Sequence, residues 1–367
     1  MSLLEFLSRT GGLRTVDQLT EEAYRYNIEG ALLDPDQGHD REDLWHVSFH
    51  GSSFPGDNPK ACGRRALYSM VDTPRAPFRR RLMQQADAGK DIENRLAQNW
   101  HDAGMLLTPP PGEPQMEFFD GDHWLVSTVD SMLLPLSSDM PIVCEIKSKS
   151  WEVIDAMQRL VRGPDEKHVF QLKCQLGLAH EAGERTVYRC YNTNRLAIKM
   201  LVASEDGEPR LDFVCAHHKT DKCLREVRLL APTRGKIYYV SRDAPSDSFE
   251  FHFDYDPEFM RRGREVLANW REHFIEGALP QTNFDDKRFS HPFGWLWGDE
   301  PCKWCDFGQV CREDHREAVK TKEHTRLKDS AAVEHAGSTR RDYTYDAVRE
   351  RVFKRWKMND PKVAKRQ

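Results

Sequence analysis

Residues 142–148 carry the most informative hydrophobic pattern in the chain, an apolar stretch of strand length that contains one acid and one base. Side chains alternate between the two faces of a strand, so Glu145 and Lys147 are expected to point the same way, opposite to Cys144 and Ile146. Charged side chains are seldom buried without a partner or a metal ion. Taken alone, this Glu-x-Lys pattern also fits a surface ion pair on an edge strand.

A second strand is predicted over residues 124–134. Asp130 shares its parity with Trp124, Val126 and Met132, which places a carboxylate on an apolar face. The polar residues 135–141 form a short loop, so a hairpin would carry Asp130 close to the acid and base of the next strand. Two carboxylates and an amine that meet in a dry place suit a divalent cation and phosphodiester hydrolysis.

The best predicted helix covers residues 78–103, where small and apolar side chains recur every three or four positions. Glu93 lies inside this stripe, four residues after Gly89. A carboxylate there needs a metal or a partner, and the alternative is a buried salt bridge to Arg95 or Lys147. Further helices are predicted at 151–162, 165–181 and 256–275, and strands at 44–49, 186–190, 197–202, 210–214 and 237–240.

Composition narrows the class of protein. The chain has 367 residues, a net charge of −5 and no apolar run of the roughly 20 residues that a membrane span needs. Its N-terminus lacks the features of a signal peptide. Nine cysteines are an odd number in a long chain, which favours a reduced, cytoplasmic protein over a disulfide scaffold. Residues 316–367 hold 15 Lys and Arg against 8 Asp and Glu, which fits either a solvated surface or contact with phosphates.

Cysteines near the C-terminus form the second chemical signal. Cys302, Cys305 and Cys311 follow a Cys-x-x-Cys-x5-Cys pattern that offers three of the four ligands wanted by zinc or an iron–sulfur cluster. Cys62 is the candidate for the fourth, although alone it would be interpreted as a buried structural cysteine. A separate group of thiols and imidazoles could bind Zn²⁺, although its spacing is not a standard one. It consists of Cys215, His217, His218 and Cys223.

Asp130 followed by Glu145-Ile146-Lys147 resembles the core of the PD-(D/E)XK nucleases, and specifically their RecB-type exonuclease branch. The segment from Gly89 to Glu93 resembles the first motif of that branch, with Glu where many members have His. The segment from Gln171 to Gln175 resembles its final helix motif, with Gln where many have Tyr. The likeness covers residues 49–313.

This resemblance implies an α/β fold with a restriction-endonuclease-like core, a mixed β-sheet flanked by helices. It implies a metal-dependent DNA exonuclease whose acids Glu93, Asp130 and Glu145 hold Mg²⁺ or Mn²⁺. Lys147 would then assist the attacking water, and Gln171 would orient the substrate.

The early cysteine and the late cysteine trio also resemble the 4Fe–4S staple of a subset of RecB-type nucleases, including CRISPR-associated iron–sulfur exonucleases. In this interpretation Cys62, Cys302, Cys305 and Cys311 join the N- and C-terminal regions, with zinc as the alternative metal. The expected organisation is an N-terminal region at 1–76, a nuclease core at 77–290, a cluster-binding segment at 291–315 and a basic tail at 316–367.

The expected function is hydrolysis of single-stranded DNA or duplex ends in recombination, repair or phage DNA metabolism. A non-catalytic DNA-binding subunit and a trimming nuclease of a CRISPR-adaptation-like complex remain the alternatives. DNA is the expected partner, together with a helicase, recombinase or integrase and no membrane. The expected location is the cytoplasm, or the host cytoplasm if a phage encodes the protein.

Overall fold

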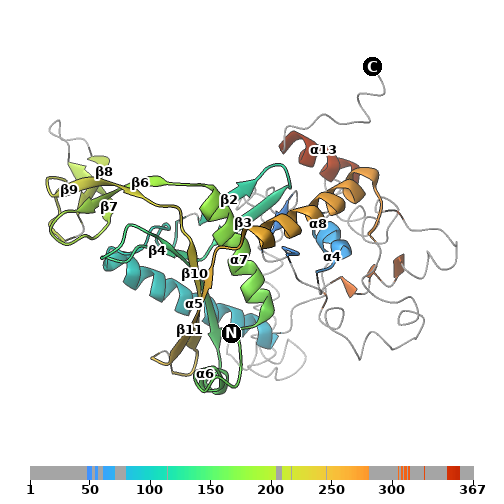
Figure 1. Ribbon diagram of the computed structural model, residues 1–367, viewed down its shortest axis with the longest axis horizontal. Coiled ribbons are helices and arrows are strands. Elements are labelled where there is room, and N and C mark those ends of the chain that lie inside the picture. The colour runs from blue at the N-terminus through green and yellow to red at the C-terminus, as the bar shows by residue number, and fades with distance from the viewer. Residues whose placement is uncertain are drawn as a thin grey trace, which may run out of the picture.

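The structure is a computed structural model. It describes residues 48–51, 54–56, 61–70, 80–113, 115–203, 209–215, 217–244, 246–280, several positions between 305 and 314, residue 326 and residues 345–355. Its elements in chain order are β1 (Phe49–His50), α4 (Gly63–Met70), α5 (Arg80–Asp102), β2 (Met116–Asp120), β3 (Leu125–Val129), β4 (Ser131–Leu133), β5 (Ile142–Lys149), α6 (Trp151–Gln158), α7 (Glu166–Glu181), β6 (Arg185–Cys190), β7 (Ala197–Ala203), β8 (Pro209–Cys215), β9 (Leu224–Leu229), β10 (Arg234–Ser241), β11 (Ser248–Asp254), α8 (Pro257–Glu276) and α13 (Tyr345–Arg355) (Figure 1).

Two mixed sheets form the centre of this α/β fold. One has the strand order β1-β3-β2, and the other has the order β11-β10-β5-β4. In the second sheet β5 runs parallel to β10 and antiparallel to β4, so it is flanked on both sides. The predicted mixed sheet with flanking helices is confirmed at this level, although the strands divide into two sheets.

The strand predicted over residues 124–134 is interrupted at Asp130. The chain leaves the first sheet after β3 and enters the second at β4, so Asp130 lies at the passage between them. The predicted hairpin is formed by β4 and β5, with Ser131 opposite Cys144. Because β4 is only 3 residues long, the edge of β5 beyond Cys144 is left without a β4 partner.

Helices cover the two faces of the β5 sheet. On one face, Ala97 of α5 packs with Cys144 and Ile146 of β5 and with Leu106 and Leu133. On the other face, α7 lies against β5 and β10 and also contacts β2 and β3 (Figure 1). Alternate side chains of β5 therefore face different helices, as the strand period requires.

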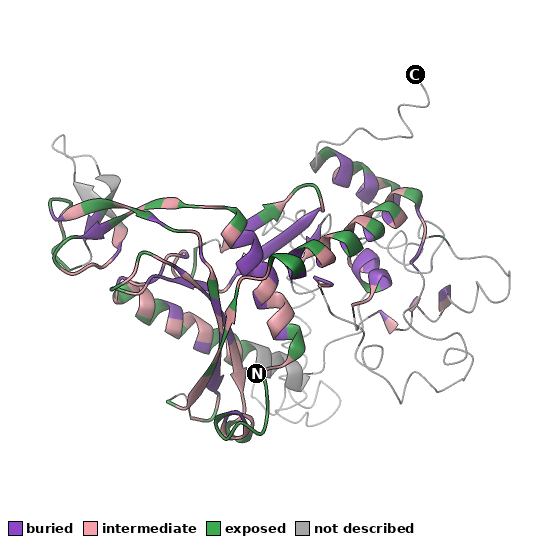
Figure 2. Cartoon of the chain, viewed as in Figure 1, coloured by how far each residue is buried: buried purple, intermediate pink, exposed green. Residues whose placement is uncertain are grey.

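The main core continues from α7 to α8, α4 and α13, whose inner faces are buried (Figure 2). In α13 the buried side chains are those of Tyr345, Val348 and Val352, and Tyr345 Oη donates a hydrogen bond of 2.5 Å to the carbonyl oxygen of Phe274. This helix of the basic tail is thus packed into the core.

Several predicted boundaries need correction. Helix α6 ends at Gln158 rather than at residue 162, because Arg159 leaves the helical conformation and Leu160 takes a φ of +58°. Strands β2, β9 and β11 were not predicted, although residues 248–254 alternate strictly between polar and phenylalanine side chains. In the described part of the chain, no helix is long and apolar enough to span a membrane.

Strands β6 to β9 form a separate lobe that projects from the central sheets (Figure 1). It consists of two antiparallel pairs, β6 with β9 and β7 with β8. A small cluster of Leu134, Leu196 and Leu229 connects the lobe to the hairpin region.

Candidate active site

Asp130 is held in place by the open edge of β5. Its Oδ2 accepts a hydrogen bond of 3.1 Å from the backbone N–H of Ile146, a group that β4 is too short to pair. This bond fixes the carboxylate beside the residues on either side of Ile146. The sequence prediction that Asp130 lies near Glu145 and Lys147 is therefore matched by the structure.

Glu145 and Lys147 share one face of β5 and form an ion pair. The side chain of Glu145 is fully buried, whereas that of Lys147 is 26% exposed. The Nζ of Lys147 also lies 3.5 Å from Asp130 Oδ2, so its ammonium group bridges the two carboxylates. Such a partner is what a buried carboxylate requires.

Glu93 approaches the same group from α5. Its side chain is 20% exposed, and its Oε1 lies 2.7 Å from the Nζ of Lys90 one turn earlier. The partners considered from sequence were Arg95 and Lys147, so Lys90 was missed. A Cβ on Gly89 would lie 2.9 Å from Ser148 Oγ, and the glycine therefore lets α5 pass close to the end of β5.

Gln175, not Gln171, contacts the acids. The amide nitrogen of Gln175 donates to Glu145 Oε2 at 2.7 Å and to the carbonyl oxygen of Thr128 at 2.9 Å, and the side chain is fully buried on α7. Among the described residues, no hydrogen bond joins Gln171 to the three acids. The two glutamines lie one helical turn apart, but only the second lies directly above β5.

The pKa shifts reflect crowding of like charges in a dry place. Burial, and then the charge of Asp130, raise the pKa of Glu145 to about 8. The same two causes raise the pKa of Glu93 above its usual value. Burial alone would lower the pKa of Lys147, but the carboxylates of Glu145 and Asp130 raise it above its usual range.

These residues fit a hard divalent cation by the chemistry of their donors. Asp130 and Glu145 both contact the Lys147 ammonium group, and Glu93 is near enough to interact electrostatically with Asp130 and Lys147. The oxygen atoms of the three acids are not all within 4.8 Å of one another. Within the described residues, that criterion for a metal site is met by a separate Cys/His group. The negative charges of Asp130 and Glu145 can lie close together because the ammonium group of Lys147 lies between them.

A basic rim continues from Lys147 toward the start of α7. Lys149 Nζ contacts Asp165 Oδ2 at 2.6 Å, and Arg162 Nη2 contacts Asp165 Oδ1 at 2.8 Å. Burial and the positive charges of Lys147 and Lys149 lower the pKa of His168 to about 3. The imidazole of His168 is hydrogen-bonded to Tyr239 Oη at 2.9 Å and is neutral at ordinary pH.

The thiols predicted as a cluster site are partly described. Cys62 precedes α4, and Cys305 and Cys311 lie in the C-terminal segment, whereas Cys302 lies outside the described residues. Burial raises the pKa of Cys311 to about 11; Arg64 opposes the shift, and Cys62 and Cys305 are near enough to add to it. Thiols more than 240 residues apart in sequence are therefore neighbours.

The other predicted thiol and imidazole group is also assembled, with one change in membership. Cys215, His218 and Cys223 meet, and their fourth neighbour is Cys190 rather than His217. Cys190 was missed because it lies 25 residues before Cys215 in sequence, and only the pairing of β6 with β9 brings it close.

Comparisons with known proteins give weak similarities. No protein-family model matches the chain, and no curated protein has a significantly similar sequence. Among solved structures, an alkaline exonuclease from Laribacter hongkongensis is 8% identical, with a TM-score of 0.37 over 63% of this chain and 91% of that chain. The same exonuclease in complex with dAMP is 11% identical over the same shares, with a TM-score of 0.35. Neither similarity is high enough to assign a family.

Proposed function

We propose that the protein is a metal-dependent DNA exonuclease of the PD-(D/E)XK type, which hydrolyses phosphodiester bonds in single-stranded DNA or at duplex ends. The observation that supports this function is the contact of Asp130 and Glu145 with Lys147, with Glu93 near enough to interact electrostatically with Asp130 and Lys147. Glu93 lies on helix α5, Asp130 lies at the passage between the two sheets, and Glu145 and Lys147 lie on strand β5. An ordinary surface ion pair does not require a fully buried carboxylate such as Glu145, nor two further acids near one lysine.

Glu93, Asp130 and Glu145 would hold Mg²⁺ or Mn²⁺, with Asp130 and Glu145 as the principal ligands. When bound, such an ion polarises a phosphoryl oxygen and lowers the pKa of a bound water. Gln175 positions Glu145 through its hydrogen bond to Oε2. Gln171 stays a predicted substrate contact, since it lies on the same helix and is partly exposed.

Lys147 would act as a cation, because its raised pKa keeps the ammonium group protonated at neutral pH. A protonated amine donates hydrogen bonds and cannot accept a proton. Its role is therefore to orient the attacking water by hydrogen bonding and to stabilise negative charge that develops on the phosphate.

The thiols of Cys62, Cys302, Cys305 and Cys311 would hold a 4Fe–4S cluster, with zinc as the alternative. The nearness of Cys311 to Cys62 and Cys305 supports this assignment. An iron–sulfur cluster would give anaerobically purified protein a brown colour, whereas zinc would leave it colourless. The metal would tie the region before α4 to the segment after α8.

A cleavage assay tests the proposed enzyme. End-labelled single-stranded and blunt duplex DNA are incubated with the full chain and Mg²⁺ or Mn²⁺, alongside a covalently closed circle that offers no ends. The parent should shorten the linear substrates and spare the circle. Asp130→Ala and Lys147→Ala should each lose activity by about a hundredfold or more, because each removes a group required at the reacting phosphate.

The matched control is Lys236→Ala, because Lys236 lies on the neighbouring strand at the register position of Cys144 and pairs with Glu250. It should keep parental activity, and all variants should bind DNA nearly as the parent does. Equal cleavage by the parent and the site variants would refute the assignment. DNA binding without cleavage by the parent would indicate the non-catalytic subunit, and capture of an integrase would favour the trimming nuclease.

A further inference from the structure

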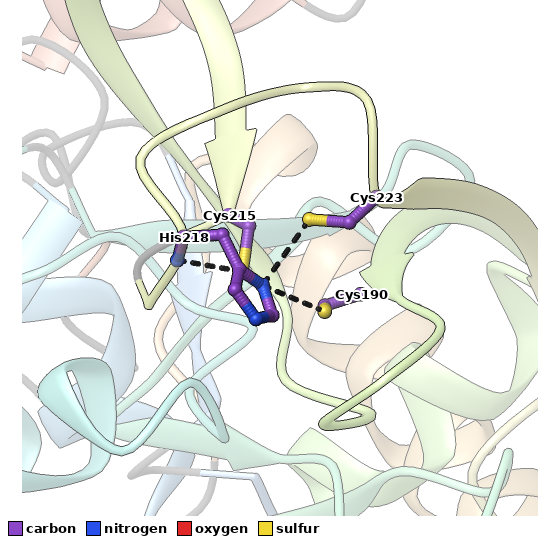
Figure 3. A group of neighbouring side chains, drawn as sticks. All are labelled: Cys190, Cys215, His218 and Cys223. Atoms are coloured by element: carbon purple, nitrogen blue, oxygen red, sulfur yellow. Dashed lines mark hydrogen bonds between the residues drawn. The ribbon is translucent and has the colours of Figure 1, made fainter.

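Four potential metal ligands meet inside the lobe formed by β6 to β9, away from the carboxylate site. Cys190 ends β6, Cys215 ends β8, and His218 and Cys223 lie in the turn that leads to β9 (Figure 3). Their ligand atoms all lie within 4.8 Å of one another.

The distances match the edges of a tetrahedral zinc site. His218 Nδ1 lies 3.4 Å from Cys190 Sγ, 3.3 Å from Cys215 Sγ and 3.4 Å from Cys223 Sγ. Zinc bonds of about 2.3 Å to sulfur and about 2.0 Å to nitrogen place sulfur and nitrogen roughly 3.5 Å apart at a tetrahedral angle. The observed nitrogen-to-sulfur distances are close to this value for all three thiols.

Hydrogen bonding alone does not explain this arrangement. A ring nitrogen of imidazole offers either one N–H group or one lone pair, directed along a single line in the ring plane. Three sulfur atoms around one Nδ1 therefore cannot all be its hydrogen-bond partners. Their convergence is the arrangement that a cation between them requires.

The backbone around Cys215 forms a tight turn that directs groups at its sulfur. Lys219 N–H donates to the carbonyl oxygen of Cys215 at 2.8 Å, and Cys215 N–H donates to the carbonyl oxygen of Thr220 at 3.0 Å. Lys219 takes a φ of +54°, and the backbone N–H of His218 points at Cys215 Sγ at 3.5 Å. An N–H group directed at a sulfur stabilises the thiolate form that binds metal.

Among the described side chains, the apolar cluster at the three cysteines is small. The three cysteines are buried together, and Leu224 is the partly buried apolar side chain packed against them. Two-stranded antiparallel pairs are marginal in water unless something holds them together. A structural metal commonly supplies that stability in small domains.

We propose that Cys190, Cys215, His218 and Cys223 bind one structural Zn²⁺ ion. On binding, the three thiols release their protons, and His218 ligates through neutral Nδ1, so the ion is four-coordinate. With four protein ligands the site has no open position for water, and it holds β6, β8 and β9 together rather than taking part in hydrolysis.

The zinc site also supports the hairpin that carries Glu145. Arg189, next to Cys190, is buried and donates to the carbonyl oxygens of Ser138, Leu136 and Asn194 and to Asp139 Oδ1. These acceptors include the loop between β4 and β5. The ion therefore fixes the strand end from which Arg189 reaches the hairpin.

Zinc content of the full chain, purified without chelators, tests the proposal. Metal per chain is measured by inductively coupled plasma mass spectrometry for the parent and for Cys215→Ser, His218→Ala and His217→Ala. The first two variants should each contain one equivalent less zinc than the parent. His217→Ala is the matched control, because His217 is exposed beside His218 but is not one of the four ligands, and it should keep the full content.

A further variant separates metal loss from misfolding. His218→Cys supplies a fourth thiolate and should retain the zinc that His218→Ala loses. The proposal is overturned if Cys215→Ser and the parent hold equal zinc. It is equally overturned if the parent holds none at this site, with its three thiols oxidised or freely reactive toward a thiol reagent. Because Asp130→Asn should keep its zinc, this result is separable from that of the cleavage assay.

Discussion

At the scale of single residues, the site depends on how one buried carboxylate is compensated. Glu145 has Lys147 on one oxygen and Gln175 on the other, and both contacts lie inside the fold. The sequence predicted the acid and the amine, because strand parity places them on one face. It did not select Gln175 over Gln171, since that choice depends on how α7 is rotated above β5.

Replacing Gln175 separates the two glutamines. Gln175→Leu removes the donor to Glu145 Oε2 and should raise the pKa of Glu145 further, since that hydrogen bond favours the charged form. We expect the pH–rate profile of DNA cleavage to shift to higher pH, with a smaller change in apparent DNA affinity. Gln171→Ala is the comparison, and it should leave the profile in place; a shift in that variant alone would reverse the assignment.

Glu145 also makes stability depend on pH when no divalent cation is present. The pKa of Glu145 is raised to about 8 in the folded protein, so the folded state keeps a proton that the unfolded chain loses near its ordinary pKa. Stability from this group is present at low pH and is lost as pH rises toward 8, by at most about 1.4 kcal/mol per pH unit.

His168 acts in the opposite direction below pH 6.5, because its pKa is lowered to about 3. The informative window is therefore pH 6.5 to 8. Urea unfolding in cation-free buffer without chelator should show stability falling with pH in the parent and not in Glu145→Gln. Identical pH dependence in both proteins would show that Glu145 is not the responsible group.

At the scale of elements, helices were predicted well and strand connections less well. The helices α5, α7 and α8 follow three- and four-residue apolar spacing and begin and end within two residues of the predictions. The break of the strand at Asp130 was not predicted, because the alternation of side chains continues across it. The same alternation runs through β3 and β4, and only their pairing with different strands assigns them to different sheets.

The contact between α8 and the segment that precedes α4 tests element packing. A Cβ on Gly263 would lie 2.1 Å from the ring of Phe54. Helix α8 can therefore pack directly against Phe54 only because Gly263 has no side chain. Gly263→Ala should destabilise the protein by about 1–3 kcal/mol through overpacking, despite the better helix propensity of alanine. Urea unfolding measures the change.

Gly163→Ala is the control for this substitution, because a Cβ on Gly163 meets nothing within 4 Å. Its stability should stay within about 1 kcal/mol of the parent or rise slightly. If Gly263→Ala were as stable as this control, α8 would not be packed as described.

At the scale of the whole molecule, contacts distant in sequence join the parts. Arg64 of α4 donates to the carbonyl oxygen of Pro280 at 2.8 Å, and Arg189 links the β6–β9 lobe to the hairpin. The sequence indicated Cys311 because the spacing of the late thiols is visible locally, and it offered Cys62 as the candidate for their fourth ligand. Partners such as Cys190 and Arg189 could not be found in this way, because nothing in their own neighbourhoods indicates the distant group they contact.

The contact of Arg189 with the hairpin loop can be tested by mutation. Arg189→Met keeps much of the buried side-chain volume but leaves several loop carbonyl oxygens without their donor. It should therefore lower the free energy of unfolding by about 2–4 kcal/mol. Arg159→Met is the control, because Arg159 is exposed and, in the described part of the chain, its ion pair is with Asp155 of the adjoining helix α6. Equal unfolding midpoints in urea for the two variants would contradict the proposed link between lobe and hairpin.

Binding of Mn²⁺ to the purified full chain tests most directly whether the acids meet around a hard cation. Free Mn²⁺ is followed by electron paramagnetic resonance as protein is added, for the parent, Asp130→Asn, Glu145→Gln and the surface control Asp155→Asn. The parent and the control should bind the ion saturably, and the two site variants should bind it at least tenfold more weakly. Equal affinity in all four proteins would mean that Asp130 and Glu145 do not hold the metal.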